Sequence, residues 1–129
     1  MLTKIITPKV YCAGPGVFDT QRNDKEYCEN WGRQHGFDVL HPGRHGATVP
    51  LKEIYHHCRQ DARSCDVIVA DLNNFRGHCA DDGTAFEVGV GAENGALVLG
   101  HKEQREEPFS RIPGSYQNKD GTWVDPNGN

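Results

Sequence analysis

Short apolar runs alternate with amphipathic segments along most of the chain. The runs occupy residues 9–16, 37–42, 66–72 and 96–101, and Gly, Pro or polar residues bound them. This pattern predicts four strands, the first of which ends in the turn Gly14-Pro15-Gly16. Because residues 66–72 are apolar in both alternating sets of positions, we expect this strand to be central, parallel and covered on both faces.

Helical patterns occupy the segments between these runs. The first predicted helix covers residues 22–35, with Gly36 as its C-cap. The second covers residues 50–64, and its apolar stripe is predicted to face the core through Ile54, Cys58, Ala62 and Cys65. The third is predicted to run from Thr84 to about Asn94.

The predicted elements alternate in the order βαβαβαβ, which indicates an α/β fold with a parallel sheet between helices. In such sheets, ligands bind beyond the carboxyl ends of the strands. Three predicted loops lie there, at residues 14–18, 41–47 and 72–83. Residues 102–129 are polar, contain three prolines and match no strand or helix pattern, so we expect an irregular tail within a single domain of residues 1–129.

Composition narrows the classes of partner. The chain has 129 residues and a net charge of −4, and its Lys and Arg residues form no dense run. Nucleic acid and anionic membrane surfaces are therefore not expected partners. No apolar stretch approaches the ~20 residues that span a bilayer. The N-terminal residues lack the continuous apolar segment of a signal peptide, and we expect a cytoplasmic protein.

Cysteine and histidine positions predict neither a disulfide framework nor a metal site. The five cysteines, at positions 12, 28, 58, 65 and 79, are odd in number and include no C-x-x-C pair. We therefore expect reduced thiols that pack as small apolar side chains. His41 and His45 flank a turn-forming Pro-Gly, and the adjacent His56 and His57 point apart, so we expect no metal.

The densest cluster of reactive side chains covers residues 78–87, at the junction of a loop and the third predicted helix. Asp81, Asp82 and Glu87 fall within seven positions, and Asp71 ends the preceding strand. One interpretation of Glu87 is structural. Thr84-x-x-Glu87 has the spacing of a capping box, a motif that stabilises a helix by about 1 kcal/mol.

The other interpretation of Glu87 is catalytic. A carboxylate in the first turn of a helix feels the positive end of the dipole and stays ionised, and apolar neighbours limit its hydration. Such a group is a nucleophile suited to an anomeric carbon. Repulsion would push a second carboxyl, Asp81 or Asp82, toward its protonated form, and retaining glycosidases use this pairing of acid and nucleophile.

Other residues of the predicted loops also have two interpretations. Gly14-Pro15-Gly16 allows close backbone approach to a sugar or phosphate, or simply forms a tight turn. Phe18 and Phe75 would either stack on a base or pack into the core.

Two blocks of sequence carry a resemblance to a known family. VYCAGPGVF at 10–18 and CDVIVADLNNFRGHCADDGTAFEVG at 65–89, with the glycine and strand that follow, resemble the nucleoside 2-deoxyribosyltransferases. The second block contains the family's D-x-G-T-x-x-E-x-G pattern, and the resemblance spans about residues 9–101 in order.

The resemblance implies a flavodoxin-like three-layer sandwich around a five-stranded parallel sheet. It implies an enzyme that cleaves the N-glycosidic bond of a 2′-deoxyribonucleoside and passes the sugar to a free nucleobase. No cofactor would be needed. Family members are homodimers or higher homo-oligomers, so a second copy of the chain is an expected partner.

The resemblance also assigns roles to individual residues. Glu87 falls on the nucleophile that forms a covalent deoxyribosyl-enzyme, and Asp81 on the aspartate linked to protonation of the leaving base. Tyr11 matches a tyrosine close to the nucleophile. The expected substrate-binding residues are Tyr11, Gly14, Phe18, Asp71, Phe75, Arg76 and Gly83.

Two departures from the family pattern leave alternatives open. Cys58 stands where many members carry an acidic or amide residue, and the family's last strand and helix, whose asparagine completes a neighbouring subunit's site, are expected to be missing. The alternatives to a transferase are a hydrolase of deoxynucleosides or their 5′-monophosphates and a catalytically inactive nucleoside-binding domain.

Overall fold

The structure is a computed structural model that describes residues 6–18, 24–46, 48–103 and 112–128. Four strands form the main sheet: β1 Lys9–Ala13, β2 Asp38–Leu40, β3 Val67–Asp71 and β4 Leu97–His101. Three α-helices connect them: α1 Asp24–His35, α2 Leu51–Ser64 and α3 Asp82–Glu93. Two short 3-10 helices follow β1 and β2, namely η1 Pro15–Phe18 and η2 Pro42–His45. These strands and helices overlap the predicted segments, although α3 begins before the predicted start and residues 22–23 of the first predicted helix lie outside the described residues.

All strand pairs of the main sheet are parallel, in the order β2-β1-β3-β4. This arrangement confirms the predicted α/β fold and the central place of β3. Tyr11 of β1 is level with Ile68 of β3, and Ile68 is level with Val98 of β4. Side chains at these positions point to one face of the sheet, because residues on a strand alternate between faces.

That face carries the main core, under helices α2 and α3. The buried residues are Tyr11, Ala13, Leu40, Cys58, Ala62, Cys65, Ile68 and Ala70, and Ile54 packs against them. The predicted core stripe of the second helix is therefore confirmed. Gly91 lets α3 approach the sheet, since a Cβ at this position would lie 2.1 Å from Cδ1 of Ile68. Burial of these side chains is the main source of stability of the fold.

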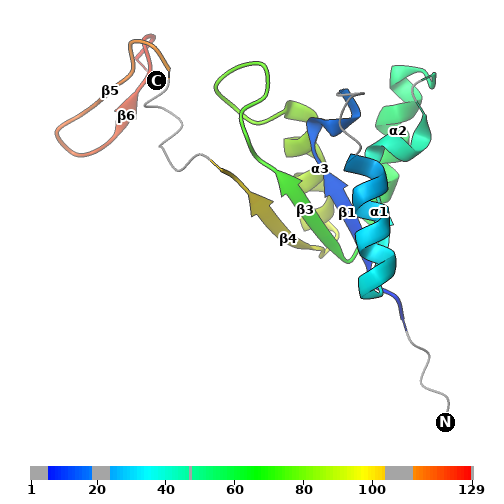
Figure 1. The fold of residues 1–129 in the computed structure, drawn as a ribbon. Coiled ribbons are helices and arrows are strands. Elements are labelled where there is room, and N and C mark those ends of the chain that lie inside the picture. The colour runs from blue at the N-terminus through cyan, green and yellow to red at the C-terminus, as the bar shows by residue number, and fades with distance from the viewer. Residues whose placement is uncertain (1–5, 19–23, 47, 104–111, 129) are drawn as a thin grey trace.

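The opposite face of the sheet is covered unevenly. Figure 1 shows α1 in front of β1, with α3 behind the sheet. Val69 of β3 is 39% exposed, and Leu97 and Leu99 of β4 are half exposed. A helix is about 10 Å wide and strands lie about 4.8 Å apart, so one helix covers only two strands. Helices therefore cover both faces of the sheet, as predicted, but α1 leaves part of β3 and much of β4 exposed.

The C-terminal segment contains a small hairpin, so the expectation of an irregular tail is wrong for part of it. Strands β5 Tyr116–Gln117 and β6 Trp123–Val124 pair antiparallel. The turn between them is closed by the Asn118 N–H, which donates to the Thr122 carbonyl at 2.8 Å, and Gly121 adopts φ +88°. Figure 1 shows the hairpin set apart from the sheet. Strands of two residues are too short to produce an alternating pattern.

The described ranges contain four parallel strands and not the five that the family resemblance implies. They also contain no helix long and apolar enough to span a membrane.

Candidate active site

A cavity of about 600 Å³ opens at the carboxyl ends of the strands, where this type of sheet binds ligands. Its walls come from the end of β1, from η2, from the N-terminal half of α2 and from the start of α3. The lining residues are Gly14, Pro42, Leu51, Lys52, Ile54, Tyr55, Cys58, Asp81, Gly83, Phe86 and Glu87. Both predicted catalytic carboxyls, and two of the predicted substrate-binding glycines, therefore share one cavity.

Asp81 is the N-cap of α3. Its Oδ2 accepts hydrogen bonds from the Thr84 N–H at 2.9 Å and from the Thr84 hydroxyl at 3.1 Å. The helix begins at Asp82, two residues earlier than predicted. Thr84 is thus inside the helix, and the capping box that would have explained Glu87 structurally does not form.

Because the helix begins early, Glu87 lies in its second turn, and not in the first turn as expected. The helix dipole acts mainly within the first turn, so it does not keep this carboxyl ionised. The side chain is buried, with 9% exposed. Burial raises the pKa of Glu87 to about 7, and the charges of Asp81 and Asp61 act in the same direction. The carboxyl is divided between its two protonation states near neutral pH.

Tyr11 and Cys58 both act on the Glu87 carboxyl. Both side chains interact with the Glu87 carboxyl and lower its pKa, against the effect of burial. The Tyr11 ring is fully buried, and burial raises the pKa of its hydroxyl far above the usual value. Burial likewise raises the pKa of the Cys58 thiol to about 11. Both groups are therefore neutral, and each brings an X–H donor to the carboxylate.

The Tyr11 hydroxyl has an unused bonding capacity. No described group forms a hydrogen bond of normal geometry with it, although Glu87 and Cys58 are close enough to affect its pKa.

Gly14 and Gly83 line the cavity as predicted, and both lie close to an acidic side chain. A Cβ on Gly14 would lie 3.1 Å from Cβ of Asp71, and one on Gly83 would lie 3.0 Å from Oδ2 of Asp81. Asp71 itself lines a smaller neighbouring cavity of about 240 Å³, which it shares with Gly14. Its Oδ1 accepts from the backbone and side-chain N–H groups of Asn73, at 3.0 and 2.8 Å.

Three other predicted substrate-binding residues are not placed in the main cavity. The Phe75 N–H donates to the Cys79 carbonyl, and the Arg76 guanidinium lies 4.9 Å from the centre of the Phe75 ring. Neither residue lines the cavity. Phe18 ends η1, and its side chain lies outside the described part of the chain.

The aromatic rings at the cavity belong to Tyr55 and Phe86, which are not among the ligand contacts predicted from the sequence. Their ring centres are 5.2 Å apart, with a tilt of 31° between the planes. Leu51 and Ile54 extend this apolar wall. A signal was present in the sequence, because Leu51, Ile54, Tyr55 and Cys58 follow the i, i+3, i+4, i+7 spacing of a second helical stripe.

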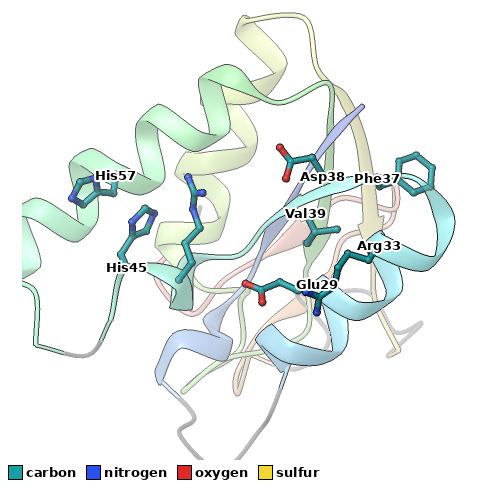
Figure 2. Close-up of a pocket in the computed structure, with 8 residues that line it drawn as sticks. Glu29, Arg33, Phe37, Asp38, Val39, His45 and His57 are labelled. Atoms are coloured by element: carbon teal, nitrogen blue, oxygen red, sulfur yellow. The ribbon is translucent and has the colours of Figure 1, made fainter. Parts of the chain in front are cut away.

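A second cavity, of about 650 Å³, lies on the outer side of β2 and is drawn in Figure 2. Its lining residues are Glu29, Arg33, Phe37, Asp38, Val39, Arg44, His45 and His57. Figure 2 shows His45 and His57 side by side, and their ring centres are 4.5 Å apart.

Buried Asp61 organises that cluster. Its Oδ2 accepts from the Arg44 Nε at 3.1 Å and lies 2.8 Å from the His45 Nε2, while Arg44 Nη2 reaches its Oδ1. These bonds tie η2 to α2 and so hold Pro42 at the rim of the active-site cavity. Arg44, His45 and Asp61 therefore connect the second cavity to the rim of the active-site cavity.

Comparison with known proteins gives a consistent result. The family model described as nucleoside 2-deoxyribosyltransferase matches residues 10–125. No curated protein sequence matches at a significant level.

Solved structures share the fold. A 2-deoxyribosyltransferase from Leishmania mexicana superposes with a TM-score of 0.70 at 27% identity, over 92% of this chain and 79% of that one. A 2-deoxyribosyltransferase from Bacillus psychrosaccharolyticus gives 0.57 at 17% identity, over 77% and 75% of the two chains. A CMP N-glycosidase from Clostridium botulinum gives 0.54 at 13% identity, over 73% and 71%. At such identities the last two show the fold alone.

Proposed function

The chain belongs to the nucleoside 2-deoxyribosyltransferase family, and on this premise we propose that it transfers 2-deoxyribose between nucleobases through a covalent bond to Glu87. The family match confirms the resemblance seen in the sequence. Family and neighbours together indicate an enzyme of the deoxyribosyltransferase or N-glycosidase type. The roles of single residues and the transfer of the sugar to a second base belong to the proposal.

One observation carries the proposal: Glu87 is a buried carboxyl with a pKa of about 7, on the wall of a cavity that it shares with Asp81. A poorly hydrated carboxylate is a strong nucleophile, because little water must be removed before it attacks. With a pKa near neutral, about half of the molecules hold the reactive form at pH 7. The Tyr11 and Cys58 donors stabilise that form.

The reaction proceeds in two displacements. The Glu87 carboxylate attacks C1′ of the deoxynucleoside, and the C–N bond breaks with its electron pair moving to the base. Asp81 passes a proton to the departing base. The acceptor base then attacks C1′ from the open side and gives its N–H proton to Asp81, while the ester bond breaks and its electron pair restores the Glu87 carboxylate. No cofactor or metal takes part in these steps.

The position of Asp81 suits its role in proton transfer. The hydrogen bonds found for this side chain among the described residues all fall on Oδ2. They fix the carboxyl at the helix start, so that Oδ1 is free to meet the substrate. A group held this rigidly needs little reorganisation when the base leaves.

Tyr55 and Phe86 are proposed to hold the nucleobase. Their rings, with Leu51 and Ile54, form an apolar wall beside Glu87. Stacking on such a wall recognises a planar ring without reading its polar edge, which suits an enzyme that must accept both a leaving base and a different incoming one. The proposed substrates are therefore a 2′-deoxyribonucleoside and a free nucleobase.

Base exchange followed by chromatography tests the proposal. The donors are 2′-deoxyinosine and thymidine, and the acceptors are adenine and cytosine. We expect a new deoxynucleoside with the wild-type chain and none with Glu87→Gln. Glu93→Gln is the matched control, because Glu93 is an exposed glutamate at the end of the same helix, and it should retain exchange.

Other results would replace the proposal by a named alternative. Free base that forms at the same rate with and without acceptor would indicate a hydrolase, and deoxynucleoside 5′-monophosphates would be the next substrates to test. Saturable binding of deoxynucleoside without turnover would indicate a binding domain. The proposed homodimer is tested separately, by sedimentation of the same sample.

A further inference from the structure

Cys12 and Cys28 meet across the interface between β1 and α1, on the face of the sheet opposite the active site. Together they line an apolar cavity of about 320 Å³ on one side and the smaller cavity of about 240 Å³ on the other. Both cysteines are half-buried free thiols, and their side chains interact directly. The proposed transfer reaction uses neither of them.

We propose that Cys12 and Cys28 form an oxidisable dithiol, a modification site at which a peroxide converts the two thiols into one intramolecular disulfide. Cys12 and Cys28 line the same two cavities, which places both thiols at one point of the interface, and a thiol next to a sulfenic acid resolves it before other reactions occur. The two cavities supply access for a molecule as small as hydrogen peroxide. The site is independent of the proposed transferase activity.

The two thiols differ in pKa, and this difference gives them different roles in the proposed oxidation. The Cys12 thiol interacts with the Cys28 sulfur and lowers the pKa of Cys28 to about 7, against burial and the charges of Asp24 and Glu29. The same interaction, together with burial, raises the pKa of Cys12 well above its usual value. The interaction therefore favours the thiolate form of Cys28 and the protonated form of Cys12.

The oxidation proceeds in two chemical steps. The Cys28 thiolate attacks one oxygen of hydrogen peroxide, the O–O bond breaks, and Cys28 becomes a sulfenic acid while hydroxide leaves and takes up a proton. The Cys12 sulfur then attacks the Cys28 sulfur, its S–H proton leaves with the sulfenic oxygen as water, and the S–S bond forms. Two electrons pass from the two sulfurs to the peroxide, and two waters are released.

The remaining cysteines lack this combination. Cys58 and Cys65 are buried, and burial raises the pKa of both thiols. Cys79 is exposed, and it serves as the control for simple accessibility. The structure therefore assigns preferential oxidation to one pair among five thiols.

A peptide map of the wild-type chain tests the proposal without any variant. The reduced protein is treated with an equimolar amount of hydrogen peroxide at pH 7, its remaining thiols are blocked, and it is digested with trypsin under non-reducing conditions. Cleavage after Lys and Arg places Cys12 in peptide 10–22 and Cys28 in peptide 26–33, with no other cysteine in either. We expect these peptides to be joined, with a mass lower by two hydrogen atoms than their sum. A link to another cysteine, a stable sulfenic acid on Cys28, or no oxidation would overturn the proposal.

Alkylation by iodoacetamide at pH 7 tests whether Cys12 increases the reactivity of Cys28. Cys12→Ala removes the donor, so the pKa of Cys28 should return toward the ordinary value of about 8.5. The thiolate fraction of Cys28 then falls, and the higher intrinsic nucleophilicity offsets only part of this loss, so Cys28 should react severalfold more slowly. Cys79→Ser should leave the rate unchanged. An equal rate in Cys12→Ala and wild type would overturn the proposed role of Cys12.

Discussion

Glu87→Gln should stabilise the fold at alkaline pH while removing base exchange. The ordinary pKa of a glutamate is 4.5, and burial raises that of Glu87 to about 7. Between these values the folded chain holds a proton that the unfolded chain has lost, so stability falls as pH rises. A shift of about 2.5 units, at 1.36 kcal/mol per unit, corresponds to a loss of about 3 kcal/mol above pH 7. Glutamine resembles the protonated acid and avoids that loss.

The assay is unfolding by urea, followed by circular dichroism at pH 5 and at pH 8. Near pH 5 the wild type and Glu87→Gln should have similar stability. At pH 8 the variant should be more stable by about 3 kcal/mol, or roughly 10 °C in Tm for a chain of this size. Glu93→Gln, on the exposed surface of the same helix, should follow the wild type at both pH values.

An equal loss of stability in Glu87→Gln at both pH values would refute this reasoning. It would mean that the carboxylate is a structural partner whose bonds the amide fails to make, as a capping role requires. Retained base exchange in the same variant would refute the assignment of the nucleophile independently of the stability result.

Three further predictions concern the surroundings of Glu87. Tyr11→Phe removes a donor that lowers the Glu87 pKa, so the acidic limb of the pH–rate profile should move up by about one unit, with exchange at pH 7 reduced severalfold and recovered at pH 9. Tyr55→Ala should raise the KM for the acceptor base by roughly fivefold to tenfold with little change in kcat, because it removes a stacking surface of about 1 kcal/mol. Asp61→Asn leaves the Arg44 guanidinium without its charged partner and should cost about 2 kcal/mol in urea unfolding at pH 7.

The sequence was sufficient for the parallel sheet because each strand is a short apolar run with a turn signal at its end. It was insufficient for the covering of the sheet. Val69 looks the same in sequence whether a helix covers it fully or in part, and the structure leaves Val69, Leu97 and Leu99 partly exposed on that face. The hairpin could not be predicted, because strands of two residues show no periodic pattern. The turn-forming segment from Asn118 to Gly121 was the one signal present in the sequence.

Part of the candidate site could likewise be predicted from the sequence, and part could not. Asp81, Gly83 and Glu87 belong to one continuous motif, so their proximity follows from the sequence, and the parallel topology brings Gly14 beside them. Tyr55 comes from a helix about 30 positions earlier, and no local pattern states which cavity its ring lines. The cap was misplaced because Asp81 and Thr84 are both good N-cap residues, and only the backbone shows that Asp81 takes the position.

The two duties of Asp81, as helix cap and as wall of the active-site cavity, constrain what can replace it. Asparagine caps a helix about as well as aspartate, and serine is nearly equivalent, but neither supplies the carboxyl proton. A lineage that stopped needing the reaction would therefore be free to drift to Asn or Ser at position 81 while still producing folded protein. In a library covering every substitution at this site, cellular abundance should follow capping preference, and catalysis should survive in a much narrower set. Comparing abundance with catalysis at position 81 would separate active enzymes of this family from folded relatives that have lost the activity.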